Sequence, residues 1–247
     1  MLLAAGKGTR MRSDLAKVLH PFAGQPLVVH PLRAAREAGA ERSIVIVGHQ
    51  REAVREAVRV ACPSERGWVV EFAVQDQQRG TGHAVCCALP ALEPGFDGAV
   101  FILSGDVPLL RGRTLGALMA ACSESGSGLA LATFVPEDPT GYGRVVRDPQ
   151  GRVVAIVEQR DASERELAIQ ECNAGVYCVL AAHLRRELPQ LGAGNAAGEV
   201  YLTDLVALRA SAGEVAAVEV DALEVAGVNT PEQLAALERH AQDRGRG

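Results

Sequence analysis

The sequence has few aromatic residues and no long apolar run. Aromatic side chains make up only 4% of the 247 residues, whereas apolar residues reach 48%. That composition is typical of helices packed on a buried sheet. No stretch approaches the roughly eighteen apolar residues that span a bilayer, and the N-terminus lacks the long hydrophobic stretch of a signal peptide. We therefore expect a soluble, cytoplasmic protein with no membrane partner.

The six cysteines form no Cys-x-x-Cys pair and have no histidine companions at zinc spacing. The chain is also too long to need disulfides for stability. Reduced, mostly structural thiols are the expectation, and the isolated histidines are interpreted as structural.

The net charge is −5, so the whole molecule does not attract nucleic acid or an anionic membrane. Any polyanion has to meet a local cluster of cations, and the densest cluster opens the chain around Gly6 and Gly8. Its cations are Lys7, Arg10, Arg12 and Lys17. Glycines let backbone N–H groups approach phosphate oxygens, which the cations neutralise. Neither the P-loop nor the dinucleotide fingerprint is matched, and a solvated glycine turn is the alternative.

Short β-branched runs alternate with stretches of helical periodicity along the chain. We predict strands over 43–47, 69–74, 99–103, 129–135, 153–157 and 175–179. We predict helices over 26–38, 50–60, 82–89, 113–122, 181–188, 199–211 and 231–241. The alternation predicts a Rossmann-like, doubly wound α/β fold with a mostly parallel sheet, whose ligands bind beyond the carboxyl ends of the strands.

Two segments depart from this alternation. Residues 142–157 contain two β-rich runs joined by an Asp-Pro-Gln-Gly turn, which predicts a small antiparallel excursion. The polar tail after Arg239 is expected to fray.

Polar residues follow several predicted strands, and each has a structural alternative. Asp106 follows strand 99–103 and a Ser-Gly turn, where its carboxylate could hold a hard cation, although a capping or turn aspartate is equally compatible. Gln75 and the Gly80-Thr81 turn offer amide and backbone groups suited to the edge of a base, or only a polar loop capped by Thr81. Glu158 could accept hydrogen bonds from sugar hydroxyls, or lie on a strand surface.

Seven further blocks follow the opening stretch in a familiar order. They are Gln75 with 80–84, then 104–109, 138–144, 156–162, 171–175, 195–204 and 227–229. With Leu3–Met11 and Lys17–His20, they resemble the sugar-nucleotide pyrophosphorylases, specifically the uridyltransferase domain of the bacterial bifunctional N-acetylglucosamine-1-phosphate uridyltransferases.

The resemblance implies a role for each site residue. Arg10, Lys17 and Asp106 would be catalytic, Arg10 by stabilising charge on the triphosphate and Lys17 by contacting phosphate at the reacting centre. Asp106 and Asn229 would hold Mg²⁺. The nucleotide would be bound by Leu3, Ala4, Ala5, Gly6, Lys17, Gln75, Gly80 and Thr81. The sugar phosphate would be bound by Ser104, Gly105, Gly143, Glu158, Asn173 and Asn229, and the Asn195 loop would also supply contacts on the sugar side.

The implied reaction joins UTP and N-acetylglucosamine 1-phosphate into UDP-N-acetylglucosamine, a peptidoglycan precursor, and releases pyrophosphate. A phosphate monoester is already largely a dianion at neutral pH, so the reaction requires no side-chain nucleophile or general base. Within one nucleotidyltransferase domain, residues 1–110 would mainly bind the nucleotide, 111–229 mainly the sugar phosphate, and 230–247 would form a terminal helix and tail.

The sequence departs from this family at both ends. Only Met1–Leu3 precede Ala4, so, unless the start is mis-called or trimmed, we expect a shortened central strand that exposes its neighbours and lowers stability. No left-handed β-helix repeats follow helix 231–241, so acetyltransferase activity is not expected and the oligomeric state is open. The alternative functions are a pyrophosphorylase for another sugar phosphate or nucleotide and a non-catalytic nucleotide-binding module.

Overall fold

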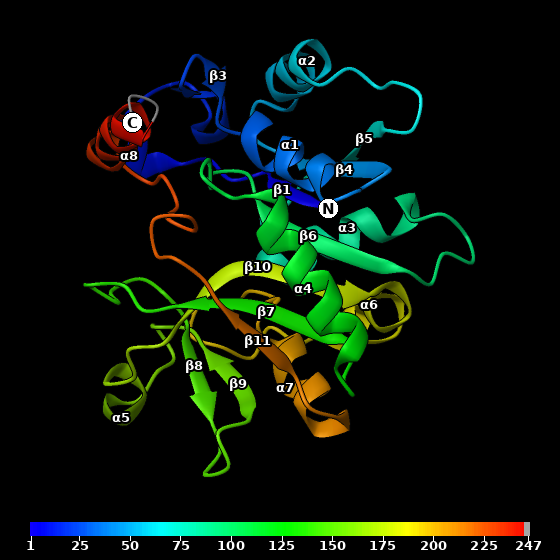
Figure 1. Ribbon diagram of the computed structural model, residues 1–247, viewed down its shortest axis with the longest axis vertical. Helices are drawn as coiled ribbons and strands as arrows, with labels where there is room; N and C mark the ends of the chain where they lie inside the picture. Colours follow the sequence, from blue (N-terminus) through cyan, green and yellow to red (C-terminus); the bar gives the residue numbers. More distant parts are fainter. Residues whose placement is uncertain (245–247) are drawn as a thin grey trace.

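Within residues 1–244, a nine-stranded sheet forms the centre of the fold, and seven of its strands follow one another in the order β11-β7-β10-β6-β1-β4-β5 (Figure 1). The computed structural model describes residues 1–244. The strands are β1 Leu2–Ala4, β4 Arg42–Val47, β5 Val69–Val74, β6 Ala99–Ser104, β7 Leu129–Phe134, β10 Cys172–Leu180 and β11 Ala216–Glu219. A hairpin of β8 Arg144–Arg147 and β9 Val153–Val157 branches from β10, and a small one of β2 Pro21–Phe22 and β3 Gln25–Pro26 lies apart.

The mostly parallel α/β sheet and the antiparallel excursion at β8–β9 are as predicted. Strands β1, β4, β5 and β6 pair in parallel, as do β7 and β11. Strand β10, however, runs antiparallel to both β6 and β7 inside the sheet. Its apolar run fits a strand buried on both faces, and that pattern does not specify strand direction.

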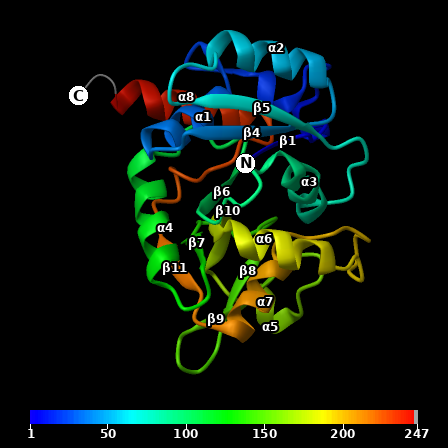
Figure 2. The ribbon, with the colours of Figure 1, turned by 90° about the vertical axis from the view of Figure 1, so that its right-hand side faces the viewer.

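Helices cover both faces of the sheet. They are α1 Val29–Glu37, α2 Arg51–Ala61, α3 Thr81–Ala88, α4 Gly112–Glu124, α5 Glu164–Leu167, α6 Ala181–Glu187, α7 Asp204–Ala212 and α8 Pro231–Arg244. Leu32, Val54 and Leu115 place α1, α2 and α4 in one apolar cluster, whereas Val85 and Leu184 place α3 and α6 in another. Figure 2 shows α4 on one side of the sheet and α3 and α6 on the other. Within residues 1–244, no helix has the length and apolar character to cross a membrane.

Several predicted boundaries were wrong. The helix predicted over 199–211 begins only at Asp204, because the preceding residues pair with the turn before α3. Helix α1 begins at Val29 rather than at residue 26, because Pro26 pairs with Pro21 in the small hairpin. Strand β11 and the short helix α5 were not predicted.

The C-terminal helix was expected to end near residue 241 and the chain to fray after Arg239. Instead α8 continues to Arg244, and residues 245–247 lie outside the described part. Leu237 of α8 and Val228 just before it pack with Met11, Phe22 and Leu27 of the opening segment. Figure 1 shows α8, in red, beside the blue opening segment that contains β3. This packing fixes the C-terminal segment beside the opening loop.

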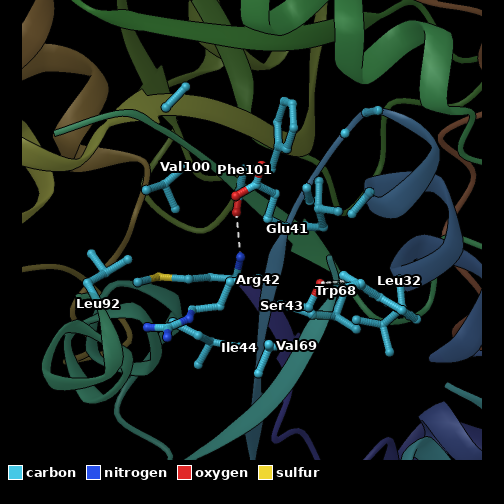
Figure 3. A pocket seen from close by; sticks show the side chains of 18 of the residues that line it. Leu32, Glu41, Arg42, Ser43, Ile44, Trp68, Val69, Leu92, Val100 and Phe101 are labelled. Atoms are coloured by element: carbon cyan, nitrogen blue, oxygen red, sulfur yellow. Dashed lines mark hydrogen bonds between the residues drawn. The ribbon is translucent and has the colours of Figure 1, made fainter. Parts of the chain in front are cut away.

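The short strand β1 leaves a hollow between its neighbours. Its residues pair with the carboxyl ends of β4 and β6, up to Val47 and Ser104. At the amino ends of these strands a cavity of about 610 Å³ opens instead. Figure 3 shows its apolar lining, with Leu92 and Val100 on one side and Leu32 and Trp68 on the other. Ser43, Ile44 and Val100 of the neighbouring strands line this cavity but are only 5%, 3% and 6% exposed, so the expected exposure of these strands is slight. The effect on stability stays a prediction.

Candidate active site

The predicted nucleotide residues meet at the carboxyl ends of β1, β5 and β6, opposite the hollow in the sheet. A cavity of about 300 Å³ opens there. Strand β1 ends at Ala4, β5 ends just before Gln75, and β6 ends at Ser104. The structure brings all eight predicted nucleotide residues into the lining, together with Ser104 and Asp106. The eight are Leu3, Ala4, Ala5, Gly6, Lys17, Gln75, Gly80 and Thr81.

Gly8 allows the opening loop to fold back on itself. Its φ is +65°, in the left-handed region, and a Cβ added there would lie 2.3 Å from Cβ of Lys17. Only glycine fits so close an approach without displacing Lys17. The turn therefore sets the position of Lys17 at the start of the short 3₁₀ helix 17–19.

Four polar side chains converge at the edge of the cavity. The Lys17 ammonium forms an ion pair with Asp106 and donates a hydrogen bond of 3.1 Å to Oδ1 of Asn229. Arg10 donates to the same Asn229 oxygen at 2.9 Å. Asn229 reaches this point because the packing of α8 holds the segment before it against the opening loop. Residues from three distant parts of the chain thus form one cluster that combines two cations with a carboxylate and an amide.

The cluster offers a position suited to a cation. Oxygens of Asp106 and Asn229 both contact one atom, Nζ of Lys17. Carboxylate and amide oxygens are ligands that Mg²⁺ accepts, and Mg²⁺ usually takes only one or two protein ligands beside substrate oxygens and water. No group of three or more His, Cys, Asp or Glu side chains within residues 1–244 has the arrangement of a metal site. A Mg²⁺ ion held by these two oxygens would complete its coordination with substrate oxygens and water.

The end of the cavity that is predicted to receive the nucleotide base, called the base end below, is built by the turn before α3. Gly80 has φ of +101°, and a Cβ there would lie 2.4 Å from the carbonyl oxygen of Val200. Gly82 donates to that same oxygen at 2.8 Å, so residues after 199 close over the turn. The alternative of Thr81 as a helix cap was wrong: α3 has no side-chain cap, and the Thr81 hydroxyl accepts from the backbone of Leu202 at 3.0 Å.

Of the residues predicted to bind the sugar phosphate, Ser104 lines this cavity, whereas Gly143, Glu158 and Asn173 lie outside its lining. The backbone N–H of Asn173 donates to the Gly143 carbonyl at 2.9 Å, which joins the β8–β9 hairpin to β10. A Cβ on Gly175 would lie 3.6 Å from the Ser104 hydroxyl, so β10 brings this group next to the end of β6. Gly105 donates its backbone N–H to Leu3 at 2.9 Å and anchors the turn before Asp106.

Glu158 lies half-buried beside Gly143. Its Oε1 accepts a hydrogen bond of 3.2 Å from the Thr203 hydroxyl. Burial raises the pKa of the Glu158 carboxyl, and the nearby charges of Asp161 and Asp204 raise it further. The alternative of a surface strand position does not hold for this side chain. A carboxylate with free acceptor capacity in such a place can bind hydroxyl groups.

Sequence reasoning assigned no role to some residues of the site. Gln78 and Glu199 line the cavity, and Nε2 of Gln78 donates to the Ala5 carbonyl at 2.6 Å. Glu199 was hidden by its predicted place in a helix. The side-chain amide of Asn195 donates to the backbone carbonyl of Glu199 and accepts from its backbone N–H, so Asn195 shapes this loop. Tyr142 packs edge-on against Phe134.

The chain is similar to known proteins over nearly its whole length. The chain is 52% identical over 239 residues to the bifunctional protein GlmU of Anaeromyxobacter dehalogenans (strain 2CP-1), covering 97% of this chain and 48% of that protein. It is 50% identical over 244 residues to the protein of the same name from Cellvibrio japonicus, covering 98% of this chain and 51% of that protein. The chain thus spans about half the length of the curated relatives it matches.

A family model also matches most of the chain. Residues 1–208 match the model described as the MobA-like NTP transferase domain. This match includes β1, the opening loop, Gln75 and Asp106, and therefore the whole lining of the 300 Å³ cavity. The chain belongs to the family of MobA-like NTP transferase domains.

Proposed function

We propose that the chain transfers the uridylyl group of UTP to N-acetylglucosamine 1-phosphate, forming UDP-N-acetylglucosamine and pyrophosphate. The observation that carries this proposal is the convergence of Arg10, Lys17, Asp106 and Asn229 beside a cavity in an NTP transferase domain. The motif resemblance and the relatives named bifunctional protein GlmU support the choice of nucleotide and sugar.

The proposed reaction requires no side-chain nucleophile. An oxygen of the sugar phosphate attacks the α-phosphorus, a new O–P bond forms, and the bond to the bridging oxygen of pyrophosphate breaks. The attacking dianion needs no base. Arg10 and Lys17 reduce the repulsion between the two anions and stabilise the charge that develops on the leaving pyrophosphate. Gly143, Glu158 and Asn173 would orient the sugar hydroxyls.

Asp106 and Asn229 would hold Mg²⁺ through one carboxylate and one amide oxygen. When bound, the ion would neutralise phosphate charge and fix the orientation of the triphosphate. Lys17 contacts the same two oxygens, so its ammonium would shift toward the phosphates when a cation binds.

The cytoplasm is the proposed compartment. All six cysteines are free in the structure, although Cys122 and Cys178 lie buried on adjacent elements. Free cysteines are usual where cellular thiols are kept reduced.

Pyrophosphate release tests the proposal. Wild-type protein with Mg²⁺ would be assayed with UTP, CTP and dTTP, each with N-acetylglucosamine 1-phosphate or glucose 1-phosphate. Preferential release with UTP and the acetylated sugar is expected. Preference for another pair would indicate a different pyrophosphorylase, and UTP binding without release would indicate the non-catalytic module.

A further inference from the structure

The side-chain amide of Gln75 is held from two sides. Its Nε2 donates to the Gly80 carbonyl at 3.0 Å and lies 3.1 Å from Nδ1 of His83. A carbonyl oxygen can only accept a hydrogen bond, so the nitrogen of the amide faces Gly80. Its second hydrogen then faces His83, whose Nδ1 acts as the acceptor. Flipping the amide would replace both hydrogen bonds with less favourable pairings.

This orientation leaves the amide oxygen for a ligand. Gln75 is only 4% exposed, yet it lines the 300 Å³ cavity. Within residues 1–244, Oε1 of Gln75 accepts no hydrogen bond, and the backbone N–H of Gly80 donates none. The base end of the cavity therefore combines one free acceptor with one free donor.

These two groups distinguish pyrimidines. Uracil has an N–H donor at N3 beside carbonyl acceptors, whereas cytosine has a lone pair at N3. An amide oxygen facing N3 can pair with uracil and repels cytosine, and a flipped amide would reverse this preference. A site that hydrogen-bonds one ligand discriminates against an analogue that leaves its buried groups unpaired.

We propose that His83 is a positioning residue that selects uracil over cytosine by holding the Gln75 amide in one orientation. His83 lies on α3, one turn before Cys87, whose Sγ is 3.8 Å from its Nε2. With Nδ1 as the acceptor, the ring hydrogen of the neutral form is on Nε2 and points toward this sulfur. The role rests on the proposed function because it assumes that a pyrimidine nucleotide occupies the cavity.

Two variants separate the acceptor from the bulk of the side chain. His83→Leu keeps an apolar side chain but removes the acceptor, whereas His83→Asn can place an amide oxygen near the position of Nδ1. The readout is the ratio of kcat/KM for UTP to that for CTP. We expect the ratio to fall about threefold to tenfold in His83→Leu, the range of one neutral hydrogen bond. His83→Asn is expected to stay within about twofold of wild type.

Equilibrium binding of UTP and CTP, measured by calorimetry without sugar phosphate, gives the same ratio independently of turnover. If the wild type binds UTP selectively but releases no pyrophosphate, the proposed function fails while the role of His83 can still be tested. An unchanged ratio in folded His83→Leu would overturn the proposal. A loss of selectivity in His83→Asn would also overturn it, and this test remains if His83→Leu does not fold. Equal binding of UTP and CTP by the wild type would overturn it as well.

Discussion

The ammonium group of Lys17 pairs with the carboxylate of Asp106, a residue 89 positions further along the chain. Both side chains are mostly covered, with exposed fractions of 18% and 14%. Asn229 accepts from the same ammonium at 3.1 Å. A partly buried cation is thus positioned by two oxygens at the edge of the 300 Å³ cavity.

Replacing Arg10 by Ala should lower kcat about 100-fold and change KM for UTP much less. Arg10 is exposed and contacts only Asn229 among the hydrogen bonds of the cluster, so its removal should leave the fold intact. Steady-state kinetics measure both constants, with Arg33→Ala on α1 as a matched control. An unchanged kcat would refute the role assigned to Arg10.

Asp106→Asn should raise the Mg²⁺ concentration for half-maximal activity by roughly tenfold or more, because a neutral amide is a weaker ligand than a carboxylate. Titration of activity with Mg²⁺ measures this shift. Glu52→Gln, an exposed carboxylate paired with Arg55 on α2, is the control and should behave like wild type. Equal Mg²⁺ requirements in Asp106→Asn and wild type would remove Asp106 from the proposed metal site.

Glu158→Gln should weaken sugar-phosphate binding but stabilise the folded protein at neutral pH. Burial raises the pKa of the Glu158 carboxyl above its unfolded value. Its ionised form therefore destabilises the fold above the folded pKa, and this cost disappears as pH falls toward the unfolded pKa. The variant should be more stable than wild type at pH 7, with a smaller difference near pH 4.5, about the ordinary pKa of glutamate.

Urea unfolding at both pH values, with KM for the sugar phosphate, checks this prediction. Thr203 can still donate to the remaining amide oxygen, so the variant keeps the one side-chain partner that Glu158 has within residues 1–244. A stability difference that grows toward low pH would contradict the sign of the shift.

A buried ion pair far from the site offers a stability test without an effect on chemistry. Arg209 is 5% exposed and donates to Glu187 at 2.6 Å and to the Ser127 carbonyl at 2.8 Å. Arg209→Met should cost about 3 kcal/mol, because it leaves a buried carboxylate with fewer partners. Adding Glu187→Leu should recover much of this loss. Urea denaturation measures the free energy of unfolding of the single and the double variant. Equal losses in the two would show that packing, not charge, determines the effect.

Much of this architecture could be predicted from the sequence because its signals are local. The strand 99–103 and the turn to Asp106 follow from apolar runs and chain punctuation, and they place the carboxylate at the correct sheet edge. The family motifs also named eight nucleotide residues that all lie in the cavity lining.

The remaining features depend on contacts between distant segments. The direction of β10, the irregular course of residues 199–203 and the shape of the loop at Asn195 are fixed by partners that no local pattern reveals. The link between His83 and Gln75 is of the same kind: an i+8 spacing across a turn carries no periodic signal. Strand β11 is short and only half-buried, so its pattern was too weak to predict.

The fate of the two ends of UTP tests the central claim most directly. Wild-type protein would be incubated with Mg²⁺, N-acetylglucosamine 1-phosphate and UTP labelled with ³²P at either the α or the γ position, and the products separated by chromatography. Label from the α position is expected in UDP-N-acetylglucosamine, and label from the γ position only in pyrophosphate. Release of γ label as inorganic phosphate, or no labelled sugar nucleotide from folded protein, would contradict uridylyl transfer.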